Sequence, residues 1–215
     1  LYIDNGLFPD ETAIKNNPHQ TFGYTVLPGD IWYQNLPDRY GKYDDSIDSN
    51  DRCYVGNPRD PEIVYGFGPS IKWKKWDCSF FFQGVAKTSI LITDNQPFAV
   101  KIGNNVYHQG LFQYIADDHW SVDNPNPNAK NPRLTHEQNP NNNQWSTYWL
   151  RNGAFLKLKN AEIGYTHKGW RFYVSGNNLL TFSPFDLWDP EMGSGNGIKY
   201  PTQRAFNVGV QVTFK

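Results

Sequence analysis

The chain has 215 residues, of which 38% are hydrophobic and 16% aromatic, and its 20 basic and 21 acidic residues leave a net charge of −1. A nearly neutral chain offers no electrostatic attraction to nucleic acid, and without an apolar run of 18 residues it holds no transmembrane helix. Disordered chains are poor in aromatic residues. We therefore expect a folded protein, although a low mean hydropathy stands beside a high aromatic content.

Three stretches are polar and rich in turn-forming residues, namely 1–61, 92–150 and 183–203. Within the second, residues 121–143 hold 8 Asn and 4 Pro, a composition that predicts a long loop without a core of its own. One or two short helices are expected between Pro97 and Trp120.

Between these stretches lie five segments in which apolar and polar residues alternate, at 62–73, 76–91, 153–167, 169–182 and 204–215. Alternation with a period of two predicts β-strands that have one apolar face and one polar face. In 153–167 the apolar residues change phase partway along the segment, which predicts a β-bulge near Asn160.

The connections between these strands alternate in length. The turns at Lys74-Lys75 and Lys168-Gly169 are short, whereas the other connections run about 20 to 60 residues, as in an outer-membrane β-barrel.

A soluble β-sandwich has alternating strands too. The barrel is favoured because the strands are longer than is typical of soluble sheets and because aromatic residues gather near their ends, as in the interfacial girdles of barrels. The two sets are Trp73, Trp76, Trp170 and Phe214 beside the short turns, and Tyr65, Phe67, Phe182 and Phe206 towards the opposite ends.

An ordered series of motifs adds a family resemblance to this pattern. The motifs include Pro28-Gly29-Asp30-Ile31, Ile47-Asp48-Ser49-Asn50-Asp51-Arg52, Tyr65-Gly66-Phe67, Phe82-Gln83-Gly84, Asn131-Pro132-Arg133-Leu134, Tyr148-Trp149-Leu150-Arg151-Asn152-Gly153, Gly176-Asn177-Asn178-Leu179-Leu180, Asp189-Pro190-Glu191 and Arg204-Ala205-Phe206-Asn207-Val208. Over residues 22–215 the chain resembles the C-terminal end of the SusC/RagA family of TonB-dependent outer-membrane transporters of the Bacteroidetes.

The resemblance implies an all-β fold, in which this chain forms the last five strands of a transmembrane antiparallel barrel of about 22 strands. It implies the division 1–61 extracellular loop region, 62–91 hairpin, 92–150 long extracellular loop, 153–182 hairpin, 183–203 extracellular loop and 204–215 final strand. The two short turns then face the periplasm. Because the chain opens at Leu1 without an initiator Met, we expect either a removed targeting segment or a part of something longer.

The resemblance also implies a function and partners. The expected activity is import of glycans or peptides across the bacterial outer membrane, not catalysis. The expected partners are the rest of the barrel and its plug, a SusD-like surface lipoprotein, TonB, the glycan or peptide substrate and the lipid bilayer, with no nucleic acid. The alternative from another class is a soluble β-sandwich that binds carbohydrate as a module.

Three groups of side chains are candidates for sites. Alternation places Asp77, Lys87, Arg171, Asn177 and Gln211 on the face towards the lumen. Three tryptophans in the loops, Trp120, Trp145 and Trp188, either stack on substrate at the outer mouth or pack the loops together. The acidic residues Asp44, Asp48 and Asp51 either hold a calcium ion through their oxygens or form a solvated loop, since the glycine and glutamate of an EF-hand loop are missing. No other cofactor is indicated.

Overall fold

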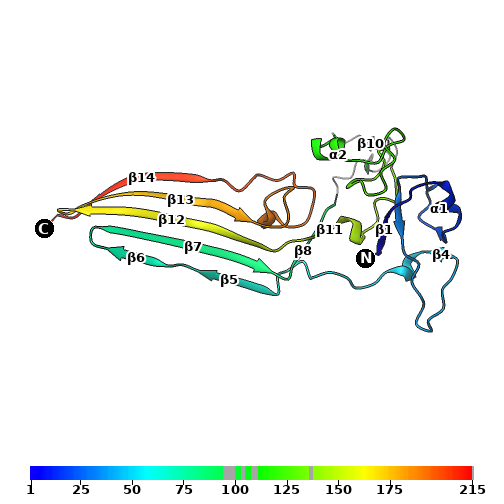
Figure 1. The fold of residues 1–215 in the computed structure, drawn as a ribbon, viewed down its shortest axis with the longest axis horizontal. Coiled ribbons are helices and arrows are strands. Elements are labelled where there is room, and N and C mark those ends of the chain that lie inside the picture. The colour runs from blue at the N-terminus through cyan, green and yellow to red at the C-terminus, as the bar shows by residue number, and fades with distance from the viewer. Residues whose placement is uncertain (94–99, 103–104, 108–110, 136–137, 215) are drawn as a thin grey trace. The chain divides into compact units, whose positions relative to one another are not determined.

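The computed structural model describes residues 1–93, 100–102, 105–107, 111–135 and 138–214, and it divides into two compact units (Figure 1). The first, which we call the loop unit, comprises Leu1–Val55 and Ile92–Leu150. The second, the strand unit, comprises Gly56–Leu91 and Arg151–Lys215. Each unit is described by itself.

The strand unit is built on one antiparallel sheet with the order β14-β13-β12-β7-β5, in which β6 also pairs with β7. The expected all-β antiparallel fold is therefore confirmed. Its strands are β5 (Ile63–Phe67), β6 (Ser70–Trp73), β7 (Trp76–Ala86), β12 (Phe155–His167), β13 (Trp170–Phe182) and β14 (Ala205–Val212). Two short strands, β8 (Ser89–Leu91) and β11 (Leu150–Asn152), pair separately, and the connection from β13 to β14 holds the 3-10 helix η3 (Pro190–Met192).

Two of the expected strands are interrupted. The segment 62–73 is divided into β5 and β6 around Pro69, which has no N–H to give to a ladder, although its carbonyl still accepts a hydrogen bond from the Phe80 N–H at 3.0 Å. The segment 76–91 is divided because Lys87 takes a left-handed conformation with φ of 52°. A residue in that conformation turns the chain out of the extended path.

The expected bulge lies beside Asn160. Leu158 pairs with Phe82 and Asn160 with Phe81, so that Lys159 is an extra residue in β12. This shift places Leu158 and Ile163 on the same face of the sheet despite their different phases in the sequence, and the predicted bulge is confirmed.

The loop unit has short elements and long connections. Its strands are β1 (Asp4–Leu7), which pairs with β3 (Ile31–Tyr33), β2 (His19–Gln20), which pairs with β4 (Ser46–Ile47), and β9 (Val100–Ile102), which pairs with β10 (Asn105–Tyr107). Its helices are α1 (Glu11–Lys15), η1 (Ser49–Asp51), α2 (Gln113–Asp117) and η2 (Thr147–Trp149). In the described part of the chain no helix has the length and apolarity needed to cross a membrane.

As expected, the described residues of 121–143 form no helix or strand, but the loop unit to which they belong has a buried core. Apolar side chains from both of its segments are buried together, among them Tyr2, Leu7, Phe8, Ile31, Tyr33, Ile47, Ile115, Trp120 and Trp149. Asn139, Asn141 and Asn142 are themselves fully buried. They are tolerated there because their amides are paired: Asn139 and Asn142 donate to Asp30 Oδ1 at 3.0 and 2.8 Å, and Asn141 donates to the Ile31 carbonyl at 3.0 Å.

Candidate functional site

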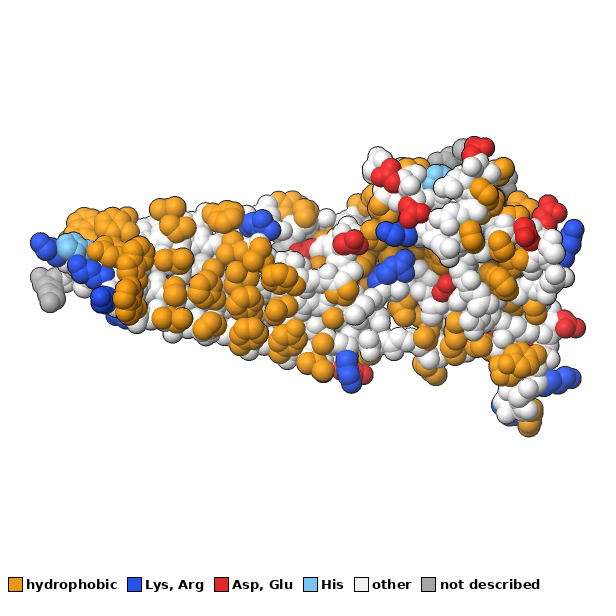
Figure 2. All heavy atoms as spheres, viewed as in Figure 1, with side chains coloured by type: hydrophobic (Ala, Val, Ile, Leu, Met, Phe, Trp, Pro, Cys, Tyr) orange, Lys and Arg blue, Asp and Glu red, His pale blue; other side chains and the backbone are white. Residues whose placement is uncertain are grey.

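One face of the sheet in the strand unit is apolar and exposed. The register places Cys78, Ile163, Val174 and Val208 in one row across four strands. Figure 2 shows apolar side chains covering this part of the molecule. A row further along the strands, with Trp76, Tyr165, Phe172 and Val210, borders a shallow hollow of about 410 Å³ on the same face.

The large area of this apolar face indicates what surrounds it. The exposed apolar side chains on this face are Ile63, Tyr65, Phe67, Ile71, Trp73, Trp76, Ile163, Trp170, Phe172, Val174, Leu180, Phe182, Phe206, Val208 and Val210. Soluble monomers rarely expose so large a continuous apolar patch. In a sandwich a second sheet would cover this face, whereas here the side chains stay exposed, as on the lipid-facing side of a barrel.

Aromatic and basic side chains meet at the hairpin end of the sheet. Trp73 pairs with Trp76 across the turn, and the Trp76 and Tyr165 rings lie 4.9 Å apart. Lys74 Nζ lies 4.8 Å from the centre of the Trp73 ring. Figure 2 shows basic side chains gathered at this end of the sheet. Tryptophan and lysine are the residues that suit the boundary between lipid tails and head groups.

The opposite face carries an ion-pair cluster. Arg171 Nε donates to Asp77 Oδ1 at 3.1 Å, its Nη2 contacts Asp77 Oδ2, and Nη2 also lies 2.6 Å from Glu162 Oε1. Sequence reasoning predicted Asp77 and Arg171 for this polar face and missed Glu162. Only the register, in which Glu162 pairs with Ser79 and Ser175, reveals that all three meet.

The other residues expected on the polar face are more dispersed. Asn177 is opposite Asn160, and Gln211 is opposite Arg171. Lys87 does not continue the alternation from which its orientation was predicted, because β7 ends at Ala86. Its Nζ instead lies 3.2 Å from Glu62 Oε2 in an exposed ion pair.

A second charged cluster on this unit was not predicted. The Lys157 side chain is only 1% exposed, and its Nζ lies 2.6 Å from both Asp189 Oδ2 and Glu191 Oε2. Lys159 Nζ lies 2.7 Å from Glu191 Oε1. Burial alone would raise the pKa values of both carboxyls, but their hydrogen bonds to these lysines outweigh it and hold each pKa below its usual range.

The three candidate tryptophans have different surroundings. Trp120 is buried, and Gly29 lies so close to its ring that no side chain would fit there. Trp188 is half-buried, donates from Nε1 to the Gly193 carbonyl at 3.0 Å, and packs edge-on against Phe185. Trp145 is 65% exposed. The structure therefore favours loop packing for Trp120 and leaves the Trp145 ring open to a ligand.

The acidic residues proposed as calcium ligands make contacts within the protein instead. Asp51 is buried and accepts from the N–H groups of Leu36 and Asp48 at 2.6 and 2.8 Å. Asp48 caps η1, and Asp44 accepts from the Ser46 N–H at 3.0 Å. Among the described residues no three acidic, histidine or cysteine side chains are gathered as a metal site. These oxygens are used to cap backbone, and the calcium expectation is not supported.

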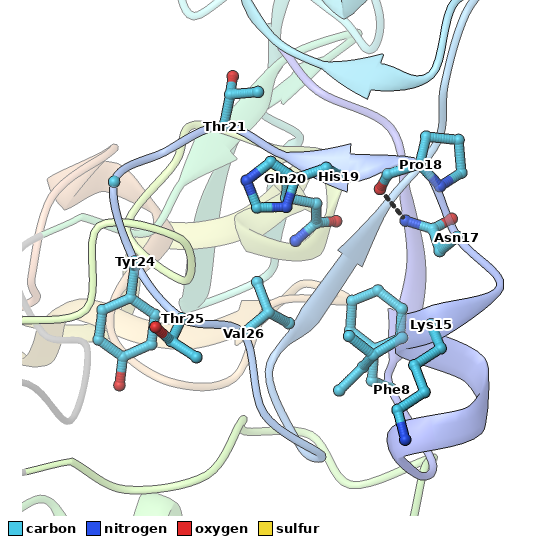
Figure 3. Close-up of a pocket in the computed structure, with 12 residues that line it drawn as sticks. Phe8, Lys15, Asn17, Pro18, His19, Gln20, Thr21, Tyr24, Thr25 and Val26 are labelled. Carbon is cyan, nitrogen blue, oxygen red and sulfur yellow. Dashed lines mark hydrogen bonds between the residues drawn. The ribbon is translucent and has the colours of Figure 1, made fainter.

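The loop unit contains a hollow of about 740 Å³ that the sequence did not predict (Figure 3). It is lined by Phe8, Ile14, Lys15, Asn17, Pro18, His19, Gln20, Thr21, Gly23, Tyr24, Thr25 and Val26. Asn17 Nδ2 donates to the Pro18 carbonyl at 2.8 Å at its edge. Its lining combines apolar rings with hydroxyl, amide and imidazole groups and the ammonium group of Lys15, the mixture of apolar and polar side chains that small-molecule sites have.

Comparisons with known proteins find relatives among TonB-dependent receptors. The chain is 29% identical over 196 residues to TonB-dependent receptor P26 of Formosa agariphila, covering 80% of the chain and 19% of that relative. It is 26% identical over 232 residues to TonB-dependent receptor P3 of the same organism, covering 97% of the chain and 21% of the relative. The chain thus spans about a fifth of the length of these curated relatives. No family model matches it.

Solved structures share the fold. A structure of the RagAB peptide transporter matches the whole chain and 22% of its own chain, with a TM-score of 0.67 at 18% sequence identity. A structure of the RagAB peptide importer in the open-open state matches over the same shares with a TM-score of 0.65. Sequence and fold together confirm the resemblance that the motifs indicated: this chain is similar to part of a SusC/RagA-type TonB-dependent transporter of the Bacteroidetes.

Proposed function

We propose that this chain forms part of the wall of a TonB-dependent importer in the bacterial outer membrane. The observation that carries the proposal is the sheet itself, with an exposed apolar face backed by a face bearing Asp77, Glu162 and Arg171. Lipid on one side and a watery channel on the other explain both. Transport across such a wall requires no catalytic group.

The sheet has an orientation in this proposal. The hairpin end, with Lys74, Lys75 and Lys168, faces the periplasm, and the connection 183–203 and the loop unit lie on the extracellular side. Unpaired backbone at the edges of β5 and β14 is costly in lipid. The sheet is therefore completed by further strands of a larger barrel, of about 22 strands in all, which enclose a plug.

The partners and substrate follow from the same proposal. The structural relatives are of the RagAB peptide importer. We propose glycans or peptides as the substrate class here, delivered by a SusD-like surface lipoprotein and admitted when TonB acts on the plug. Trp145, with its exposed ring, and the hollow beside His19 and Tyr24 are the proposed contacts of the loop unit with that substrate or lipoprotein.

Two measurements test the proposal. Cells that produce the protein are fractionated, and we expect it in the outer membrane and in solution only with detergent. A deletion strain is then grown on glycans and peptides as sole carbon sources. Loss of growth on one of them, together with loss of its uptake when the proton gradient is collapsed in the parent, supports energy-coupled import. Recovery of the protein in the soluble fraction contradicts it.

A further inference from the structure

The connection from β13 to β14, residues 183–203, is folded and not extended. Phe185 and Pro190 are buried, and Gly197 packs against the Trp188 ring. Lys199 Nζ donates to the Met192 carbonyl at 2.8 Å. We call this segment the mouth loop. Its internal contacts give it a defined shape.

The mouth loop is tied to the strands at several points. Besides the ion pairs of Asp189 and Glu191 with Lys157, Ser183 Oγ donates to the Ala154 carbonyl at 2.8 Å. Ser194 Oγ accepts from the Leu91 N–H at 3.0 Å, and the Gly195 N–H donates to the Leu91 carbonyl at 3.0 Å. The loop is therefore held near both its start and its middle.

The register shows which face of the sheet the mouth loop covers. Lys157 pairs with Gln83 on β7, and Gln83 shares a face with Asp77 because β7 is regular between them. Lys157 thus projects from the polar face. Phe155 and Val85 pair on this same face and are each only 8% exposed, whereas Val174 and Val208 on the apolar face are exposed.

The burial of Lys157 explains why the loop is held so firmly. An ammonium group that is almost fully buried is stable only when it is paired. Here two carboxylates from the loop supply three short contacts, with Asp189 Oδ1 at 2.7 Å, Asp189 Oδ2 at 2.6 Å and Glu191 Oε2 at 2.6 Å. Lifting the loop away would break all three of these contacts.

We propose that the mouth loop is a fixed, inward-folded segment that narrows the extracellular mouth of the channel, with Lys157 as its positioning residue. The inference rests on the proposed function, since the polar face is a channel wall only in a barrel that transports. It deepens that function by assigning size selection among glycans or peptides to residues 183–203.

The test uses the full outer-membrane protein in intact cells, with the free cysteines Cys53 and Cys78 replaced by serine. Val85→Cys reports whether the polar face is covered, and Asn177→Cys is the exposed reference. A sulfonated maleimide is added outside the cells and its reaction rates are compared. We expect Val85→Cys to react about tenfold more slowly than Asn177→Cys, because reaction requires the loop to open.

The double variant Asp189→Asn/Glu191→Gln then removes the anchor with little change of shape. We expect the Val85→Cys rate to rise about tenfold, and uptake of long fluorescein-labelled peptides and maltooligosaccharides to rise relative to short ones. The matched control is Asp186→Asn, in the same loop and exposed, which should change neither rate. Outer-membrane yield shows that each variant has folded.

Failure of this inference and failure of the proposed function give different results. If Val85→Cys reacts as fast as Asn177→Cys in the parent, the loop does not cover the polar face. If the double variant leaves Val85→Cys protected, Lys157 does not position the loop. Either result overturns this inference while import by the parent stands. If the parent shows no energy-dependent uptake, the proposed function fails, whatever the rates show about the loop.

Discussion

Arg171 Nε lies 3.1 Å from Asp77 Oδ1, although their strands, β13 and β7, are not neighbours in the sheet. The side chain reaches its partner by passing over Gly164 on β12. A Cβ atom added at Gly164 would lie 2.5 Å from Arg171 Nη2. The ion pair across the strand between them therefore depends on the missing side chain at Gly164.

Gly164→Ala should displace the Arg171 guanidinium and lower the unfolding free energy by about 1 kcal/mol, the value of a partly exposed ion-pair network. The measurement is urea unfolding of the detergent-solubilised protein. In an Arg171→Met background the same alanine should cost almost nothing. An equal cost in both backgrounds would mean that Gly164 acts on something other than Arg171.

Asp30 should be the most sensitive carboxylate of the loop unit. It is fully buried, and its Oδ1 accepts from Arg133 Nε at 2.8 Å as well as from the amides of Asn139 and Asn142. Asp30→Ala leaves these donors unpaired and should cost about 3–5 kcal/mol, seen as rapid proteolysis of the loop unit. Asp45→Ala, at an exposed position, is the control and should leave the digestion rate unchanged.

Two of the three candidate tryptophans, Trp120 and Trp145, should separate by experiment. Trp120→Ala empties a buried site and should cost about 3–5 kcal/mol of stability. Trp145→Ala should change stability by less than about 0.5 kcal/mol yet slow uptake of the transported glycan or peptide. Urea unfolding and uptake assays on both variants give the comparison. Unchanged uptake by the Trp145 variant would remove that residue from the substrate path.

Adjacent residues of β14 test which side of the sheet meets lipid. Val208 is 83% exposed on the apolar face, and Asn207 pairs with Ser175 on the polar face. Val208→Arg should cost about 2–4 kcal/mol, as for a charge near the bilayer midplane, whereas Asn207→Arg should be tolerated. Folding into lipid vesicles, followed by denaturant titration, measures both. Equal tolerance would contradict a lipid-facing surface.

The mouth loop should stay anchored in mildly acidic medium. Hydrogen bonds to Lys157 and Lys159 hold the pKa values of Asp189 and Glu191 below their ordinary values of 3.8 and 4.5. Carboxyls with lowered pKa values add stability above the ordinary pKa and lose it as the pH falls through the lowered one. The protection of Val85→Cys should therefore be the same at pH 7 and pH 5. Loss of protection at pH 5 would contradict this pairing.

Local patterns were enough to predict the strands of the sheet. Alternation gave the two faces, and the change of phase in 153–167 gave the bulge beside Asn160, because both depend on the two-residue repeat of a strand. The same reasoning extended two strands too far, through Pro69 and Lys87. It had no means of anticipating the left-handed conformation of Lys87. Glycine and asparagine are the residues that usually take this conformation, and neither stands at this position.

The sequence by itself determined that part of the chain forms an antiparallel sheet with one apolar and one polar face, since these follow from residue type and spacing. Only the tertiary structure decided which distant residues share a site. Asp77 meets Arg171 across 94 positions, and Asn142 meets Asp30 across 112. The Asn-rich stretch joins the buried core of the loop unit because its amides pair with residues far away in the chain, and composition alone cannot say which residues those are.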